Sequence, residues 1–234
     1  MGIIKKTLFG ATCGAVGYGY YLSKQYESIP FYQIPRQMEI NNIVNNYKTN
    51  PDEFFAYCNT YSSKIRLDPK KLTTAQPGKF HTEKDVINEI LVKFLNNGFY
   101  QLQLPKEVEL KDLDTTENNF SIYTHKPNSV VVKVEIPTMI VNNVEKLSDW
   151  GLPYRTNSTS YQEIYVELKP EVNEKTQINE TYSAEVFFSS ADLYNKHNFD
   201  GKILPRVLLS VNRFYNRLLL KAGVDSISES LGME

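Results

Sequence analysis

The chain has 234 residues, 41% of them hydrophobic, with a formal net charge of −1 and an isoelectric point near 6.3. This length is enough for one folded core, and the lack of a basic excess argues against a general nucleic-acid binder. Two cysteines and three scattered histidines make no disulfide framework and no metal-ligand cluster. We therefore expect no metal, no cofactor and no nucleic-acid partner.

Residues 1–26 are predicted to form an N-terminal signal-anchor, which is a transmembrane segment. The run at 7–22 is uncharged and built from small and apolar residues, lysines flank it on both sides, and the first acid is Glu27. It is short against the roughly 20 apolar residues of a bilayer span. Gly10 and Gly14 form a small-xxx-small pair that permits close helix contact. Three tyrosines near its end are suited to the membrane interface, namely Tyr18, Tyr20 and Tyr21.

Two other interpretations of this segment stay open, a cleaved secretory peptide and a glycine-rich helix buried in a soluble protein. An acid-free, basic N-terminus is similar to the anchors of mitochondrial membrane proteins. We therefore expect a mitochondrial membrane, with the endoplasmic reticulum membrane as the alternative. Sequons at Asn119, Asn157 and Asn179 do not decide between the two, because a chain this rich in Asn, Ser and Thr holds about three by chance.

Residues 27–37 contain two prolines and are predicted to form an extended linker between the anchor and a single α+β domain at 38–225. The spacing of apolar residues predicts that this domain begins with two helices, at 38–48 and 52–62. A brief strand is expected at 64–67.

The next helix carries a clear start signal. Thr82 and Asp85 have the spacing of a capping box, and an apolar stripe at helical spacing follows them. Gly98 stands where this helix is expected to end.

From Phe99 the hydrophobic period changes from about 3.6 to 2, which is typical of strands. The predicted strands form one antiparallel sheet and lie at 99–104, 120–124, 130–136, 161–168 and 181–189. Their alternation of apolar and polar residues predicts one dry face and one wet face. Glu163 and Glu167 fall on the wet face, where we expect solvated charge rather than a catalytic pair.

Residues 138–160, between the third and fourth strands, are expected to be irregular, with Trp150 at their centre. This sole tryptophan could guard a pocket mouth, contact lipid headgroups or plug one edge of the core. After the last strand, Ser189 and Asp192 repeat the capping spacing and predict a short helix to about His197.

The stretch 201–222 is predicted to be the longest helix, with Pro205 in its first turn and Gly223 just past its end. A polar tail is expected at 226–234. The apolar face of this helix should pack on the dry face of the sheet. The residues expected to be buried there are Val211, Phe214 and Leu218.

The opposite side of this helix carries a stripe of four cations with no acid among them. They are Arg206, Arg213, Arg217 and Lys221. Anionic lipid headgroups or the carboxylates of a partner would neutralise such a row, and a solvated helix face is the alternative. We predict these four residues, together with Trp150, as candidate ligand- or anion-binding residues.

The order of elements predicts an α+β fold in which helices, including the long C-terminal one, cover one face of an antiparallel sheet of about five strands. Over residues 99–222 this order resembles helix-grip domains, in which a curved sheet wraps a C-terminal helix. The resemblance implies an apolar cavity for a lipid or another hydrophobic ligand.

No G-x-S-x-G, phosphate-binding loop or H-E-x-x-H motif occurs, and we assign no catalytic residue. We predict a membrane-tethered, non-catalytic domain that binds membrane lipid, a hydrophobic small molecule or a membrane-protein partner. Two alternatives stay open. One is a tethered enzyme of thioesterase or cyclase type acting on an acyl or aromatic substrate, and the other is an assembly or scaffold factor without a cavity.

Overall fold

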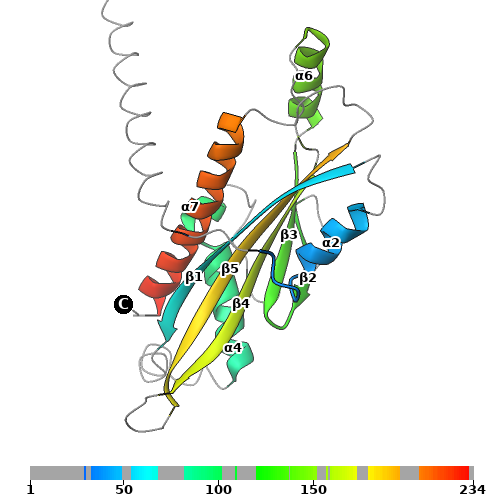
Figure 1. Cartoon of the computed structure of the whole chain (residues 1–234). Coiled ribbons are helices and arrows are strands. Elements are labelled where there is room, and N and C mark those ends of the chain that lie inside the picture. Colours follow the sequence, from blue (N-terminus) through cyan, green and yellow to red (C-terminus); the bar gives the residue numbers. More distant parts are fainter. Residues whose placement is uncertain are drawn as a thin grey trace, which may run out of the picture.

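The structure of the protein is a computed structural model (Figure 1). It describes residues 29, 33–48, 54–67, 82–101, 109, 120–136, 138–151, 157, 159–172, 179–195 and 206–231. The predicted anchor, with Gly10, Gly14 and its three tyrosines, lies outside these residues. Within them, no helix combines the length and the apolar character that crossing a membrane requires.

The described residues form an α+β fold with a five-stranded antiparallel sheet and a long C-terminal helix, as predicted. The helices are α2 (Glu39–Lys48), α4 (Glu83–Leu95), α5 (Gly98–Gln101), α6 (Thr138–Asp149) and α7 (Arg206–Ser230). The strands are β1 (Phe54–Leu67), β2 (Phe120–Lys126), β3 (Ser129–Glu135), β4 (Thr159–Val172) and β5 (Asn179–Asn195). Their order in the sheet is β1-β5-β4-β3-β2, so β1 and β2 form its edges.

Two segments that we predict as helices are strands instead. The described part of 52–62, which is 54–62, forms most of β1, and the described part of 189–197 is the end of β5. The two strands pair antiparallel along the whole length of β1. The hydrogen bonds of this long ladder and the burial of both strands outweigh the helical spacing that the sequence shows locally.

Two other segments are helical against expectation. A strand is predicted at 99–104, but its described residues, 99–101, belong to α5, because the side-chain oxygen of Asn97 accepts hydrogen bonds from the backbone N–H groups of Phe99 and Tyr100, each at 3.0 Å. Residues 138–160, expected to be irregular, begin with the 12-residue helix α6.

Helix α4 confirms its predicted start. The Thr82 hydroxyl accepts from the backbone N–H of Asp85 at 3.2 Å, and the Asp85 carboxylate accepts from the backbone N–H of Thr82 at 2.9 Å. Such reciprocal bonds satisfy two N–H groups that would otherwise lack a partner at the helix start. The helix ends at Leu95, and Gly98 opens α5.

Helices cover both faces of the sheet, so the predicted division into a dry and a wet face is wrong. Helices α4 and α7 pack on one face and α2 on the other (Figure 1). Because successive strand residues point to opposite faces, Val130 and Val132 join the core under α4 and α7, whereas Val131 joins the core under α2.

The described part of the predicted linker contacts both cores. Ile29 packs against the core under α4 and α7, and Ile34 packs against the core under α2. The chain is therefore held to the domain before α2 begins at Glu39.

Helix α7 extends further than predicted. It passes through Gly223 to Ser230. A Cβ added at Gly223 would overlap the ring of Phe94 in α4, so the two helices pack closely there. Ile227 and Leu231 are buried, and this part of the predicted polar tail therefore belongs to the core.

The buried face of α7 is also rotated from the predicted one. Val211 is 55% exposed, and Phe214 and Leu218 are only half-buried. Among the side chains of α7 and of the residue after it that the structure describes, the buried apolar ones are Leu219, Leu220, Val224, Ile227 and Leu231. They lie in the C-terminal half of the helix or directly after it, so the buried apolar contact that is described for α7 is concentrated at this end.

Candidate functional site

Two rows of polar residues cross the sheet beneath the N-terminal half of α7. The first row consists of Tyr57 of β1, Asp192 of β5 and Ser160 of β4. The second row consists of Asn59, Ser190 and Gln162. In the third row, Tyr61, Phe188 and Ile164 belong to the hydrophobic core. The face of the sheet under α7 thus changes from polar to apolar along the helix.

Asp192 lies at the centre of the polar rows and is 5% exposed. One carboxylate oxygen accepts hydrogen bonds from the Ser160 hydroxyl at 2.7 Å and from the Asn157 amide at 3.3 Å. The other oxygen accepts from the Asn212 amide of α7 at 2.9 Å. All three donors are neutral. Burial raises the pKa of Asp192, and the bonds from Ser160 and Asn212 offset part of that rise.

Asn216, one turn after Asn212, joins the two polar rows through α7. Its amide nitrogen donates to the Ser190 hydroxyl at 2.7 Å and to the Asn212 side-chain oxygen at 2.9 Å. Asn216 is 3% exposed, so these bonds satisfy a polar group that would be costly to bury alone. We call this set of residues around Asp192 the Asp192 network; its members are Asn157, Ser160, Ser190, Asp192, Asn212 and Asn216.

The side chains of two arginines of α7 contact the edge strand β1. Arg213 Nε donates to the Tyr57 hydroxyl at 2.9 Å. The guanidinium carbon of Arg217 lies 5.1 Å from the centre of the Tyr61 ring, which is within cation–π range. Burial raises the pKa of Tyr61, and the positive charges of Arg217 and Arg213 lower it in part. We call Tyr57, Asn59, Tyr61, Arg213 and Arg217 the arginine seam.

In the part of the chain that the structure describes, the arginine seam holds positive charge without a paired carboxylate, and two of its buried donors lack an acceptor. Within the described residues, neither guanidinium forms an ion pair. Arg217 Nε is buried and has no hydrogen-bond partner in this part of the chain. The same holds for the side-chain nitrogen of Asn59, a residue that is 2% exposed. Arg213 is exposed, so the seam reaches solvent at one end.

The structure brings two of the four predicted cations together and separates the other two. Arg213 and Arg217 lie in the seam, where their side chains contact β1. Lys221, one turn further along α7, forms an ion pair with Asp225. Arg206 is the first residue of α7, and its side chain lies outside the described part. Anion binding by these residues stays a prediction.

Trp150 follows directly after α6 and is 85% exposed, so the interpretation that it plugs an edge of the core is wrong. Met139, at the start of α6, is 74% exposed. Their separation of about three helical turns places both on the same side of the helix. Figure 1 shows α6 projecting beyond the end of the sheet. This helix therefore offers apolar surface to solvent.

A second buried carboxylate lies on the opposite face of the sheet. Glu163, predicted to be solvated, is 0% exposed. It accepts the backbone N–H groups of Glu39 at 3.0 Å and Ile40 at 2.8 Å. These N–H groups are at the start of α2, where the helix dipole favours negative charge. Burial raises the pKa of Glu163, and these hydrogen bonds and the charge of Lys126 offset part of the rise.

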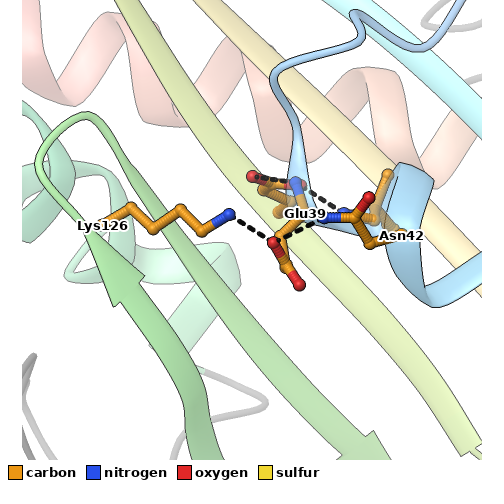
Figure 2. A network of polar contacts seen from close by, with 5 residues as sticks. Glu39, Asn42 and Lys126 are labelled. Carbon is orange, nitrogen blue, oxygen red and sulfur yellow. Dashed lines mark hydrogen bonds and ion pairs between the residues drawn. The ribbon is translucent and has the colours of Figure 1, made fainter.

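The start of α2 is also held through the side chain of Glu39. Figure 2 shows that Lys126 and Asn42 both reach the Glu39 carboxylate. Lys126 lies at the end of β2 and Glu163 in the middle of β4. Their contacts all end on the first turn of α2, so this cluster positions the helix on the sheet. We do not assign it a ligand.

Reasoning from sequence missed the Asp192 network and the place of Asn59. A signal was present, because polar and aromatic residues alternate along β1 at Tyr57, Asn59 and Tyr61 and along β5 at Ser190 and Asp192. Residues of one kind at every second position fit a strand. This strand pattern was not recognised because the residues at those positions are polar rather than apolar.

No protein-family model, curated protein or solved structure matches this chain. Its function is therefore inferred from the geometry of the arginine seam and of the Asp192 network.

Proposed function

We propose that this chain is a membrane-tethered, non-catalytic domain that binds acidic membrane lipid through the arginine seam. One observation carries the proposal: the guanidinium groups of Arg213 and Arg217 lie together on the edge strand and have no carboxylate partner within the described residues. Anionic headgroups would supply the negative charge, at roughly 1 kcal/mol for each basic residue near the surface.

The expected anchor at 1–26 supports a lipid ligand, in a mitochondrial membrane or, as the alternative, in the endoplasmic reticulum membrane. A tether keeps headgroups at high effective concentration near the domain, so that a seam of modest affinity is sufficient. The exposed Trp150 and Met139 are suited to a second contact at headgroup level.

A helix-grip-like arrangement fits the way α7 crosses one face of the sheet. A large apolar cavity fits less well under the C-terminal half of α7, because Gly223 and Phe94 pack closely there. The polar rows under the N-terminal half are better suited to a headgroup than to an acyl chain. We therefore place the ligand contact at the arginine seam.

A tethered enzyme is the second candidate, and Asp192 favours it, because a buried acid with a raised pKa is a common catalytic feature. Both of its oxygens already accept hydrogen bonds from neutral donors. The described histidine, His125, lies on the opposite edge strand, and Cys58 packs into the core under α2. In the described part of the chain, neither a Ser–His nor a Cys–His pair is thus assembled around Asp192.

The proposal is tested by sedimentation of residues 27–234 with phosphatidylcholine vesicles that contain or lack phosphatidic acid. This segment keeps Ile29 and Ile34, which pack against the two cores, and its folding is checked first by circular dichroism. We expect binding only to the acidic vesicles. Raising the salt from roughly 0.05 M to 0.5 M should weaken it, because the Debye length falls several-fold.

Changing Arg213 and Arg217 to Glu should weaken this binding by roughly 30-fold. The matched control is Lys64→Glu with Arg66→Glu. It makes the same charge change on β1, the strand that the two arginines contact, but at exposed positions that alternate with Ile65 and so face away from α7. Equal losses in the two variants would mean that net charge alone matters and would contradict the proposal. An affinity for vesicles that changes neither with salt nor in either variant would also contradict the proposal.

A further inference from the structure

The arrangement of charge in the arginine seam indicates which kind of anion it suits. Arg213 and Arg217 are one helical turn apart, a spacing at which side chains on a helix are neighbours and like charges repel. Each side chain brings one guanidinium cation to the seam. A dianion near both groups offsets this repulsion better than a monoanionic carboxylate does.

The donors of the seam also suit an oxyanion with several acceptor oxygens. Arg217 Nε and the Asn59 amide are buried donors without an acceptor within the described residues. The planar guanidinium binds phosphate through parallel N–H···O bonds. The Tyr57 hydroxyl accepts from Arg213 and can still donate its own proton. Three kinds of donor therefore lie along the contact between α7 and β1.

We propose that the arginine seam is a binding site for a phosphate monoester, in which Asn59 and Arg217 bind the inner oxygens and Arg213 binds from the solvent side. A phosphate monoester carries nearly two negative charges at neutral pH, which matches the two guanidinium groups. The source to which we commit is the headgroup of a lipid such as phosphatidic acid. This choice of source rests on the proposed function, whereas the phosphate site itself does not.

The experiment uses the full chain in micelles of a neutral detergent. Binding of inorganic phosphate and of two soluble short-chain lipids, dihexanoyl phosphatidic acid and dihexanoyl phosphatidylcholine, is measured by titration calorimetry. We expect phosphate to bind and the phosphatidic acid to bind at least tenfold more tightly. The phosphatidylcholine, whose phosphate is a diester with a choline cation, should not bind.

Arg217→Gln should weaken phosphate binding at least tenfold, because one charge-assisted contact is lost. Arg66→Gln is the matched control, since Arg66 is exposed on β1, the strand that Arg217 contacts, and faces away from α7; it should not change phosphate binding. Loss of phosphate binding in Arg66→Gln to the same extent would overturn the site.

Asn59→Asp is a variant of equal size that places a carboxylate where we infer an oxygen of the ligand. We expect it to abolish phosphate binding while its melting temperature in phosphate-free buffer at neutral pH is at least that of the unaltered chain. A clear fall in melting temperature would show that no cation is in place to compensate the buried charge, and would overturn the site.

Absence of phosphate binding by the unaltered chain overturns the site as well, whereas salt-dependent vesicle binding would leave the proposed function standing. Conversely, phosphate binding without vesicle binding supports the site and contradicts the proposed function. Equal affinity for phosphate and for dihexanoyl phosphatidic acid supports the site and overturns its assignment to a lipid.

Discussion

The two halves of α7 meet the same face of the same sheet in different ways. The C-terminal half buries Leu219, Leu220 and Val224 together with α4. The N-terminal half places Asn212 and Asn216 over two polar rows, and its Arg213 and Arg217 contact β1. The hydrophobic effect stabilises the first contact, whereas the second contact depends on matched hydrogen bonds.

This difference separates stability from function within one helix. Buried polar groups contribute little net stability even when they are fully paired, and they cost free energy when they are not. An apolar N-terminal half would hold the helix on the sheet at least as well. We infer that the polar rows serve to bind a ligand or to position side chains, rather than to stabilise the fold. Substitutions in each half of α7 test this contrast.

The largest effect is expected in the apolar half. Leu220 is 0% exposed, so Leu220→Ala should lower the free energy of unfolding by about 2–5 kcal/mol, as in other cores. Chemical denaturation of residues 27–234 gives this value. Val211→Ala, on the exposed side of the other half, should stay within about 0.5 kcal/mol. Comparable losses at the two positions would show that the halves do not differ.

A smaller loss is expected at Gly223, where α4 and α7 are closest. Alanine would improve helix propensity by about 1 kcal/mol, but its Cβ would overlap the Phe94 ring, and overpacking costs about 1–3 kcal/mol. We expect Gly223→Ala to destabilise by roughly 1 kcal/mol net. Combination with Phe94→Leu should show coupling in a double-mutant cycle. Gly98→Ala, where no atom is within 4 Å of the added Cβ, should not destabilise. A stabilised Gly223→Ala variant would mean that the helices are further apart.

The smallest effect concerns pH in the polar half. Because burial raises the pKa of Asp192 in the folded state above its ordinary value of 3.8, the folded protein binds a proton there more tightly than the unfolded chain. The stability that protonated Asp192 contributes is therefore complete below about pH 3.8 and is lost as the pH rises through the folded-state pKa.

Asp192→Asn does not titrate at this position, so it serves as the reference. Subtracting its free energy of unfolding from that of the unaltered domain cancels the other carboxyl groups. We expect this difference to fall as the pH rises from 4 to 7.5, on top of a constant cost of about 1 kcal/mol for the changed hydrogen bonds. A difference that is flat, or that rises with pH, would show that Asp192 is not a buried acid with a raised pKa.

Much of the fold could be predicted from the sequence. The capping box at Thr82 and the apolar stripe of α2 specify those helices locally, because hydrogen bonds and spacing within a few residues suffice. The alternation in β3 and β4 predicted strands at nearly the observed places. The long C-terminal helix was evident from its period, although its true end was not, because Gly223 is a packing contact rather than a stop.

Two of the errors lie at the candidate site. β1 was predicted mostly as a helix and the end of β5 as a short helix, and these are the segments that contribute Tyr57, Asn59, Ser190 and Asp192 to the polar rows. Departures of this kind from local consistency are expected at functional sites. The sequence identified Arg213 and Arg217 as candidate binding residues. It did not identify Tyr57 and Asn59 of β1, which we propose contact the same ligand.

What the sequence by itself determined is the fold class, most of the elements and the presence of a cationic helix. The elements and the cationic helix follow from patterns within one segment, and the fold class follows from the order of the elements. Only the tertiary structure decided that Asp192 is buried, that Glu163 holds α2, and that the two arginines lie on β1. The physical reason is that a polar residue can be buried only where distant segments supply its hydrogen-bond partners, and no local pattern records where those partners are.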